Sequence, residues 1–173
     1  MKKILIFVLF LQHNIMAKSN TEQVGDVLSL LIPTVAFGST YLVDDADGRM
    51  EFLKAYGSTA LATQILKYTV RAPRPNNPNS ITSFPSGHTS SAFSGASFIH
   101  KRYGLRYALP AYAGAIYTAY SRVHAKKHYT KDVIAGALLG MGFSYYFVSP
   151  YKNLHIEPSI GDKTYGLQFN YTW

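Results

Sequence analysis

Five uncharged runs recur along the chain and indicate a helical fold. Each run is rich in Ala, Leu or Gly, is about three helical turns long or longer, and is bounded by turn-forming residues, which favours helices over strands. No repeat of fixed period separates the runs, and 173 residues suit a single domain. We therefore predict an all-α, up-and-down bundle of about five helices, over residues 27–43, 55–66, 89–99, 107–121 and 133–151.

The first 19 residues differ from the rest and are typical of an export signal. Lys2 and Lys3 precede an apolar stretch over residues 4–11, and Ala17 and Ser19 offer small side chains for cleavage. The apolar stretch is too short to cross a membrane comfortably. We expect residues 1–19 to be a cleaved signal peptide, with an uncleaved anchor as the alternative, and in either case we expect the protein to leave the cytoplasm.

Residues 152–173 show a different periodicity. From Tyr165 to Trp173, aromatic and aliphatic residues alternate with small or polar ones, which is typical of a half-buried strand. A partner strand can begin near Leu154. The sequence therefore predicts a helical domain over residues 20–151 and a short C-terminal β-hairpin or strand after it.

The net charge of +8 is unevenly distributed and indicates anionic partners. Asp132 is the one acidic residue between Phe52 and Ile156, so this stretch lacks the carboxylate pair of a glycosidase and the carboxylates that usually hold magnesium in phosphoryl transfer. The chain has no cysteine, which excludes thiolate metal sites and cysteine nucleophiles. Nucleic acid, phosphate esters and an acidic membrane surface remain as candidate partners.

The helical runs leave two placements of the bundle open. The first and last runs, over residues 27–43 and 133–151, approach the roughly 20 apolar residues that a membrane span needs. The other three runs are shorter. The outer two runs favour integration into a membrane, and a soluble bundle is the alternative.

Two polar clusters lie between the second and third predicted helices. Lys67 and Arg74 lie at the exit of the second helix, where cations ordinarily complement the helix dipole. Ser86, Gly87 and His88 lie at the start of the third, where backbone N–H groups form a ready anion site and the imidazole is placed to donate a proton. Each cluster alone also has an ordinary structural explanation, as a charged helix end or a cap.

A third cluster joins the fourth and fifth predicted helices and contains Arg122, His128 and Asp132. On a continuous helical path His128 and Asp132 share a face, so we expect the carboxylate to orient the imidazole. His124, His128 and Asp132 could instead bind a metal ion, although the surrounding lysines and arginines oppose a cation there.

An up-and-down topology brings all three clusters to the same end of the bundle. The end of the second helix, the start of the third, the end of the fourth and the start of the fifth must share that end. We expect three fixed cations, a helix N-terminus, two histidines and one carboxylate to meet there, from Lys67, Arg74, Ser86, Gly87, His88, Arg122, His128 and Asp132.

The spacing of these residues resembles that of a known family. Lys67 is followed after six residues by Arg74-Pro75, residues 85–88 read Pro-Ser-Gly-His, and Ser121-Arg122 is followed after five residues by His128 and after three more by Asp132. This pattern is similar to that of the type 2 phosphatidic acid phosphatase superfamily, which includes lipid phosphate phosphatases, bacterial acid phosphatases and vanadium haloperoxidases. The helix layout extends the resemblance to about residues 26–150.

The resemblance implies a phosphatase that needs neither metal nor cofactor. His128 would be the nucleophile and form a phosphohistidine, while Asp132 holds its ring. His88 would protonate the departing alkoxide and then activate water, so the pH profile should be bell-shaped. The phosphate oxygens would be neutralised by Lys67, Arg74 and Arg122 and by N–H groups around Ser86 and Gly87.

These expectations define one main function and three alternatives. The main function is a phosphatase of the bacterial cell envelope that hydrolyses a phosphomonoester or pyrophosphate on a lipid, in the inner membrane with its active site facing the periplasm. The alternatives are a soluble periplasmic acid phosphatase, a vanadate-dependent haloperoxidase and a non-catalytic anion binder, which would leave the paired histidines unexplained. We expect no nucleic-acid partner for an exported chain, and the sequence does not indicate an oligomeric state.

Overall fold

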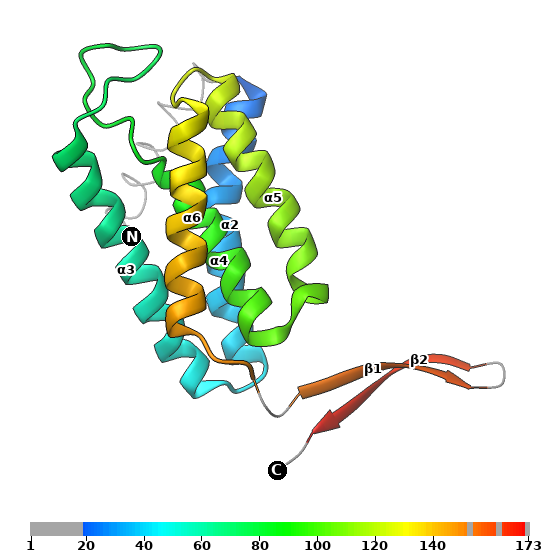
Figure 1. Cartoon of the computed structure of the whole chain (residues 1–173). Coiled ribbons are helices and arrows are strands. Elements are labelled where there is room, and N and C mark those ends of the chain that lie inside the picture. The colour runs from blue at the N-terminus through cyan, green and yellow to red at the C-terminus, as the bar shows by residue number, and fades with distance from the viewer. Residues whose placement is uncertain (1–18, 152–153, 162–163, 172–173) are drawn as a thin grey trace, which may run out of the picture.

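The computed structural model describes residues 19–151 and, for the backbone alone, residues 154–161 and 164–171 (Figure 1). The predicted signal peptide over residues 1–19 therefore lies outside the described residues, except for Ser19. Residues 19–151 confirm the predicted all-α bundle. Its five helices are α2 (Asn20–Leu42), α3 (Ala46–Val70), α4 (Gly87–Tyr103), α5 (Leu105–His124) and α6 (Thr130–Phe147).

Polar residues extend most helices beyond the uncharged runs that predicted them. α2 begins at Asn20 rather than at residue 27, because Ser19 caps it by accepting a hydrogen bond from the Glu22 N–H at 3.2 Å. α3 begins at Ala46 rather than at residue 55, because Asp45 accepts one from the Gly48 N–H at 2.9 Å. An uncharged run thus marks the central part of a helix, whereas capping hydrogen bonds determine where the helix begins.

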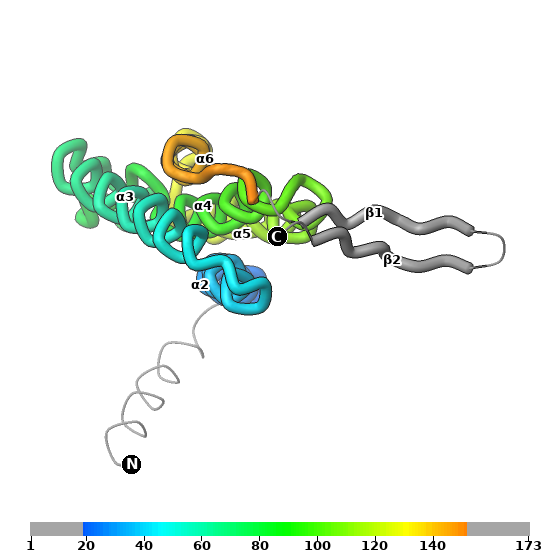
Figure 2. The backbone as a smooth tube through the Cα atoms, turned by 90° about the horizontal axis from the view of Figure 1, so that it is seen from below, coloured from blue at the N-terminus to red at the C-terminus, as the bar shows by residue number. Residues whose placement is uncertain are grey.

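α4 lies at the centre of the bundle and contacts the other four helices (Figure 2). Ten of its 17 residues are buried, and most of these are Ala, Ser, Gly or Thr, which allow close approach of neighbouring helices. Phe98 of α4 packs edge-to-face on Phe52 of α3, with ring centroids 5.1 Å apart. The helix that begins at Gly87 is therefore held on several sides.

α6 packs closely against the start of α4 through two glycines. A Cβ atom at Gly136 would lie 2.5 Å from the carbonyl oxygen of Ser86, and one at Gly140 would lie 2.5 Å from that of Ser90. The Ser86 N–H also donates to the Asp132 carbonyl oxygen at 2.9 Å. The starts of α4 and α6 are thereby fixed beside each other.

A buried ion pair joins the helices at the opposite end of the bundle. The Arg102 guanidinium donates two hydrogen bonds to the Asp45 carboxylate, with Nε–Oδ2 2.7 Å and Nη2–Oδ1 2.5 Å. Arg102 also donates to Glu51 and to the carbonyl oxygen of Ser149. Because the pair is bidentate and further hydrogen-bonded, it ties the end of α4 to the start of α3 and to the segment after α6.

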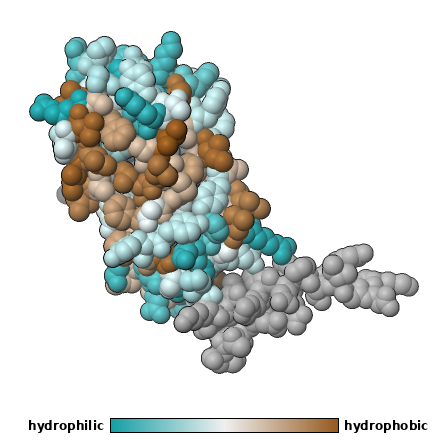
Figure 3. Space-filling model, viewed as in Figure 1, coloured by the Kyte–Doolittle hydropathy of each residue, from teal (hydrophilic) through white to brown (hydrophobic). Residues whose placement is uncertain are grey.

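Large apolar side chains also lie on the outside of the bundle. On the face shown in Figure 3 they gather over its middle, between hydrophilic ends. Several are more than half exposed and come from α2, α3, α5 and α6, among them Leu30, Leu61, Ile65, Ile116 and Leu138. In the described part of the chain one helix, α2, is long and apolar enough to cross a membrane.

The backbone after the bundle forms two antiparallel strands, β1 (Leu154–Gly161) and β2 (Thr164–Tyr171). Leu154 pairs with Tyr171 and Gly161 pairs with Thr164. The side chains of these strands lie outside the described residues, so the predicted half-buried hairpin stays a prediction.

The contact between α4 and α6 yields a matched test on one helix. Gly140→Ala should lower the free energy of unfolding by about 1–3 kcal/mol, because the new Cβ meets α4 backbone that cannot move aside. Gly142→Ala should be neutral or stabilising, because a Cβ there meets nothing within 4 Å. Thermal unfolding of the two variants compares them, and equal destabilisation would contradict the proposed contact.

Candidate active site

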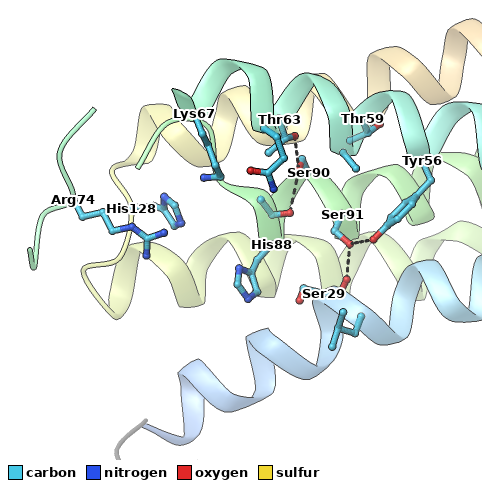
Figure 4. Close-up of a pocket in the computed structure, with 14 residues that line it drawn as sticks. Ser29, Tyr56, Thr59, Thr63, Lys67, Arg74, His88, Ser90, Ser91 and His128 are labelled. Atoms are coloured by element: carbon cyan, nitrogen blue, oxygen red, sulfur yellow. Dashed lines mark hydrogen bonds between the residues drawn. The ribbon is translucent and has the colours of Figure 1, made fainter. Parts of the chain in front are cut away.

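The residues singled out in the sequence gather at one end of the bundle, around two cavities. The end of α3, the connection over residues 71–86 and the starts of α4 and α6 all reach this end (Figure 1). The cavities have volumes of about 380 Å³ and about 180 Å³. The larger is lined by Lys67, Arg74, Gly87, His88 and His128 among others (Figure 4). The smaller shares Arg74, His88 and His128 and adds Arg122, Glu22, Asp26 and Lys127.

The hydrogen bonding of His128 fixes which ring nitrogen carries the proton. His128 is 3% exposed, and its Nδ1 lies 2.7 Å from the carbonyl oxygen of Ser83. A carbonyl oxygen can only accept a hydrogen bond, so Nδ1 carries the proton. In the neutral ring Nε2 then holds the lone pair that can act as a nucleophile.

The surroundings of His128 keep its ring neutral. Burial, followed by the positive charges of Arg74 and Lys67, lowers the pKa of His128 to about 4, despite the opposing effects of the Ser83 hydrogen bond and of Asp132. A neutral imidazole is the nucleophilic form. Burial and the two neighbouring cations thus keep this ring in its nucleophilic form at neutral pH.

Asp132 does not bind His128 in the way that the sequence predicts. Its Oδ2 lies 3.8 Å from His128 Nδ1, beyond hydrogen-bond distance, and accepts from the Ser83 hydroxyl at 2.6 Å and from the Tyr129 N–H at 2.9 Å. The reason is that α6 begins at Thr130, so His128 lies in the preceding loop and shares no helical face with Asp132. The carboxylate orients His128 indirectly, through Ser83 and through its charge.

The start of α4 contributes its residues in different ways. Gly87 lines the larger cavity and is the first residue of α4. The first hydrogen bond of the helix runs from the Ser90 N–H to the Ser86 carbonyl oxygen. Ser86 is fully buried and lines neither cavity. Its N–H donates to the Asp132 carbonyl oxygen and is therefore not directed into either cavity. The side chain of His88 is 44% exposed and lines both cavities. His88 and Gly87 therefore face the cavities, whereas Ser86 joins two helices.

Lys67 and Arg74 approach the site from α3 and from the connection after it. Lys67 is buried, and its Nζ donates to the carbonyl oxygens of Pro85 and Thr82 at 2.6 and 2.8 Å. Lys67 thus also shapes the turn that leads into α4. Arg74 Nε is buried and has no hydrogen-bond partner among the described residues. An unpartnered guanidinium N–H beside a cavity is suited to bind an anion.

Arg122 reveals an acidic residue that the sequence reasoning missed. Its Nη1 lies 2.6 Å from Asp26 Oδ1, and its Nη2 donates to the Glu22 carbonyl oxygen at 2.7 Å. His88 Nε2 lies 3.1 Å from the same Asp26 oxygen. Asp26 was overlooked because the first helix was predicted to begin at residue 27. In an up-and-down bundle the first helix begins at the same end as the third and the fifth, so this topology places the start of the first helix beside the site.

The metal-binding alternative does not fit this geometry. His124 lies on the exposed surface and stacks on Tyr120, with ring centroids 5.4 Å apart, whereas His128 and Asp132 are buried. Across the described ranges no group of three or more His, Asp or Glu side chains is placed to hold a metal ion. The expectation that the reaction needs no metal stays a prediction.

The environment of His128 can be tested by NMR of the histidine ring nitrogens. Resonances assigned by comparison with His128→Asn should show the Nδ1–H tautomer, with a pKa near 4 rather than the ordinary 6.5. The ring should therefore stay neutral at all pH values above about 5 and gain its proton only as the pH falls towards 4. Titration near 6.5, or an Nε2–H tautomer, would contradict this assignment.

Two curated proteins are similar to part of the chain. The lipid A 4'-phosphatase of Helicobacter pylori strain J99 is 43% identical over 102 residues, which are 55% of this chain and 52% of that protein. The lipid A 1-phosphatase of Porphyromonas gingivalis is 37% identical over 78 residues, 43% of this chain and 17% of that protein. The chain thus spans about half the length of the first relative and a smaller part of the second.

A solved structure and a family match complete the comparison. The crystal structure of Aquifex aeolicus LpxE superposes with a TM-score of 0.57 at 22% sequence identity, covering 75% of this chain and 87% of that one, which shows a shared fold. The sequence model of the PAP2 superfamily matches residues 49–155, which include every motif from Lys67 to Asp132. Because this match covers more than half of the 173 residues, it confirms the resemblance seen in the sequence, and the chain belongs to the PAP2 superfamily.

Proposed function

We propose that the protein is a metal-independent phosphatase that hydrolyses a phosphomonoester or pyrophosphate on a membrane lipid. The observation that carries this proposal is the pairing of two histidines in different environments at one cavity. His128 is buried, neutral and presents Nε2, whereas His88 is half exposed and lies beside a carboxylate. Two imidazoles with opposite protonation states are what acid–base and nucleophilic catalysis require of one site.

In the first step His128 Nε2 attacks phosphorus. An N–P bond forms, the ester P–O bond breaks, and the proton on His88 passes to the departing oxygen, which leaves as an alcohol. The phosphorylated His128 ring then carries a positive charge and keeps its Nδ1–H on the Ser83 carbonyl oxygen. The carboxylate of Asp132, 3.8 Å from Nδ1, stabilises that charge.

In the second step water releases the phosphate. Neutral His88 accepts a proton from water as the new O–P bond forms and the N–P bond breaks, so inorganic phosphate leaves and both rings return to their starting states. Charge on the phosphoryl oxygens is neutralised by Lys67, Arg74 and Arg122 and by the Gly87 N–H. No step needs a redox partner.

A lipid substrate is supported by the relatives and by the surface of the bundle. Both curated relatives are named as phosphatases of lipid A, so we propose a phosphorylated lipid of the bacterial envelope as the substrate. Leu30, Ile116 and Leu138 lie more than half exposed around the bundle. Water-soluble monomers rarely expose large apolar patches. The membrane-embedded form is therefore favoured over the soluble acid phosphatase.

Phosphate release by the purified full chain tests the catalytic proposal. Wild type should release phosphate from a lipid phosphate in the presence of EDTA, and vanadate should block it by occupying the phosphate site. His128→Ala should lower turnover by about 1,000-fold or more. His124→Ala, which removes the nearby exposed histidine, should keep turnover near that of wild type. Loss of activity in EDTA, or full activity of His128→Ala, would refute the mechanism.

Single cysteines test the proposed placement in the inner membrane with the site facing the periplasm. The chain has no cysteine, so Lys131→Cys at the active-site end and Arg106→Cys at the opposite end each introduce a unique label position. In intact bacterial cells a membrane-impermeant maleimide should label the first variant, and it should label the second only after lysis. Resistance of the protein to high-salt extraction is the accompanying control. Labelling of both in intact cells, or of Arg106→Cys alone, would contradict this placement.

A further inference from the structure

The carboxylate of Asp26 lies inside a site that is otherwise cationic. Its Oδ1 contacts His88 Nε2 at 3.1 Å and Arg122 Nη1 at 2.6 Å, so one oxygen links residues of α4 and α5. Asp26 itself belongs to α2, 23% of its side chain is exposed, and it lines the smaller cavity. No motif of the sequence analysis includes it.

The neighbours of Asp26 determine its charge and that of His88. A guanidinium favours the ionised form of an adjacent carboxylate, and a carboxylate favours the protonated form of an adjacent imidazole. Among the described residues, the smaller cavity is also lined by the charged groups of Arg74, Lys127 and Glu22 and by the neutral ring of His128. Lys127 lies 3.6 Å from Glu22, which offsets part of its charge.

On the basis of the proposed function, we infer that Asp26 is a positioning residue for the general acid. It accepts the Nε2–H of His88 and holds the ring as an imidazolium, so that the Nδ1–H is the proton that the departing oxygen of the substrate takes. Asp26 stays ionised throughout because Arg122 remains beside it, so the proton moves only between His88 Nδ1 and the leaving oxygen, and later from water back to Nδ1. Asp26 therefore acts through His88 and forms no bond to phosphorus.

A purely structural role of Asp26 would have a different signature. Arg122 is also held by the Glu22 carbonyl oxygen and the Ser121 hydroxyl, so Asp26 is one of three anchors of that guanidinium. Its contact with His88 serves a half-exposed ring rather than the core. Loss of an anchor would slow all substrates alike, whereas loss of proton donation would slow only substrates with a poor leaving group.

The leaving-group dependence of Asp26→Asn separates these two roles. With dodecyl phosphate, whose alkoxide must be protonated, kcat should fall about 10- to 100-fold. With p-nitrophenyl phosphate, whose phenolate leaves unprotonated, kcat should fall less than about 3-fold. The basic limb of the dodecyl phosphate profile should also move to lower pH, because the His88 imidazolium loses its proton more readily without the carboxylate.

Three further variants complete the test. Asp26→Glu should restore dodecyl phosphate turnover, and Asp47→Asn, an exposed acid at the far end of the bundle, should match wild type on both esters. In a His88→Gln background, Asp26→Asn should cause no further loss, since the residue it acts through is gone. Thermal unfolding of each variant shows whether it remains folded.

The outcomes separate this inference from the function on which it rests. Equal losses on the two esters, unchanged turnover, or additive losses in the His88→Gln background would overturn the role of Asp26 while leaving the phosphatase intact. Wild type that releases phosphate from neither ester would overturn the proposed function and this inference with it.

Discussion

The close approach of α6 to the start of α4 is the constraint on which the site depends. Gly136 and Gly140 leave no space for a side chain between the helices, and the Ser86 N–H bonds to the Asp132 carbonyl oxygen. Because this contact fixes two helix starts against each other, the residues just outside them meet in space. His88 enters with α4, and the loop before α6 brings His128.

The electrostatics of the site follow from unequal burial of its charged groups. His128 is buried beside Lys67 and Arg74, and this placement disfavours a further positive charge on its ring. His88 is half exposed and has a carboxylate at 3.1 Å, which favours its positive form. A single cationic site thus keeps one imidazole neutral and supports protonation of the other, which is the division that the proposed phosphoryl transfer through His128 needs.

Sequence patterns predicted the centres of the five helices and the gathering of the motif residues at one end, since both depend on local periodicity and on alternating helix direction. The patterns did not predict where the helices begin and end, because a few capping hydrogen bonds determine those positions. The start of α6 at Thr130 removed the expected bond between Asp132 and His128, and the start of α2 at Asn20 brought the unforeseen Asp26 into the site.

The sequence by itself determined the helical fold, the motif spacing and the cationic character of the site, because these are properties of residue order and composition. Only the tertiary structure decided which atoms meet: Ser83 rather than Asp132 on the His128 ring, Asp132 rather than a substrate on the Ser86 N–H, and Asp26 on both His88 and Arg122. Hydrogen bonds and ion pairs between distant segments form only when the distance between two atoms is right to within a few tenths of an ångström, and packing sets those distances.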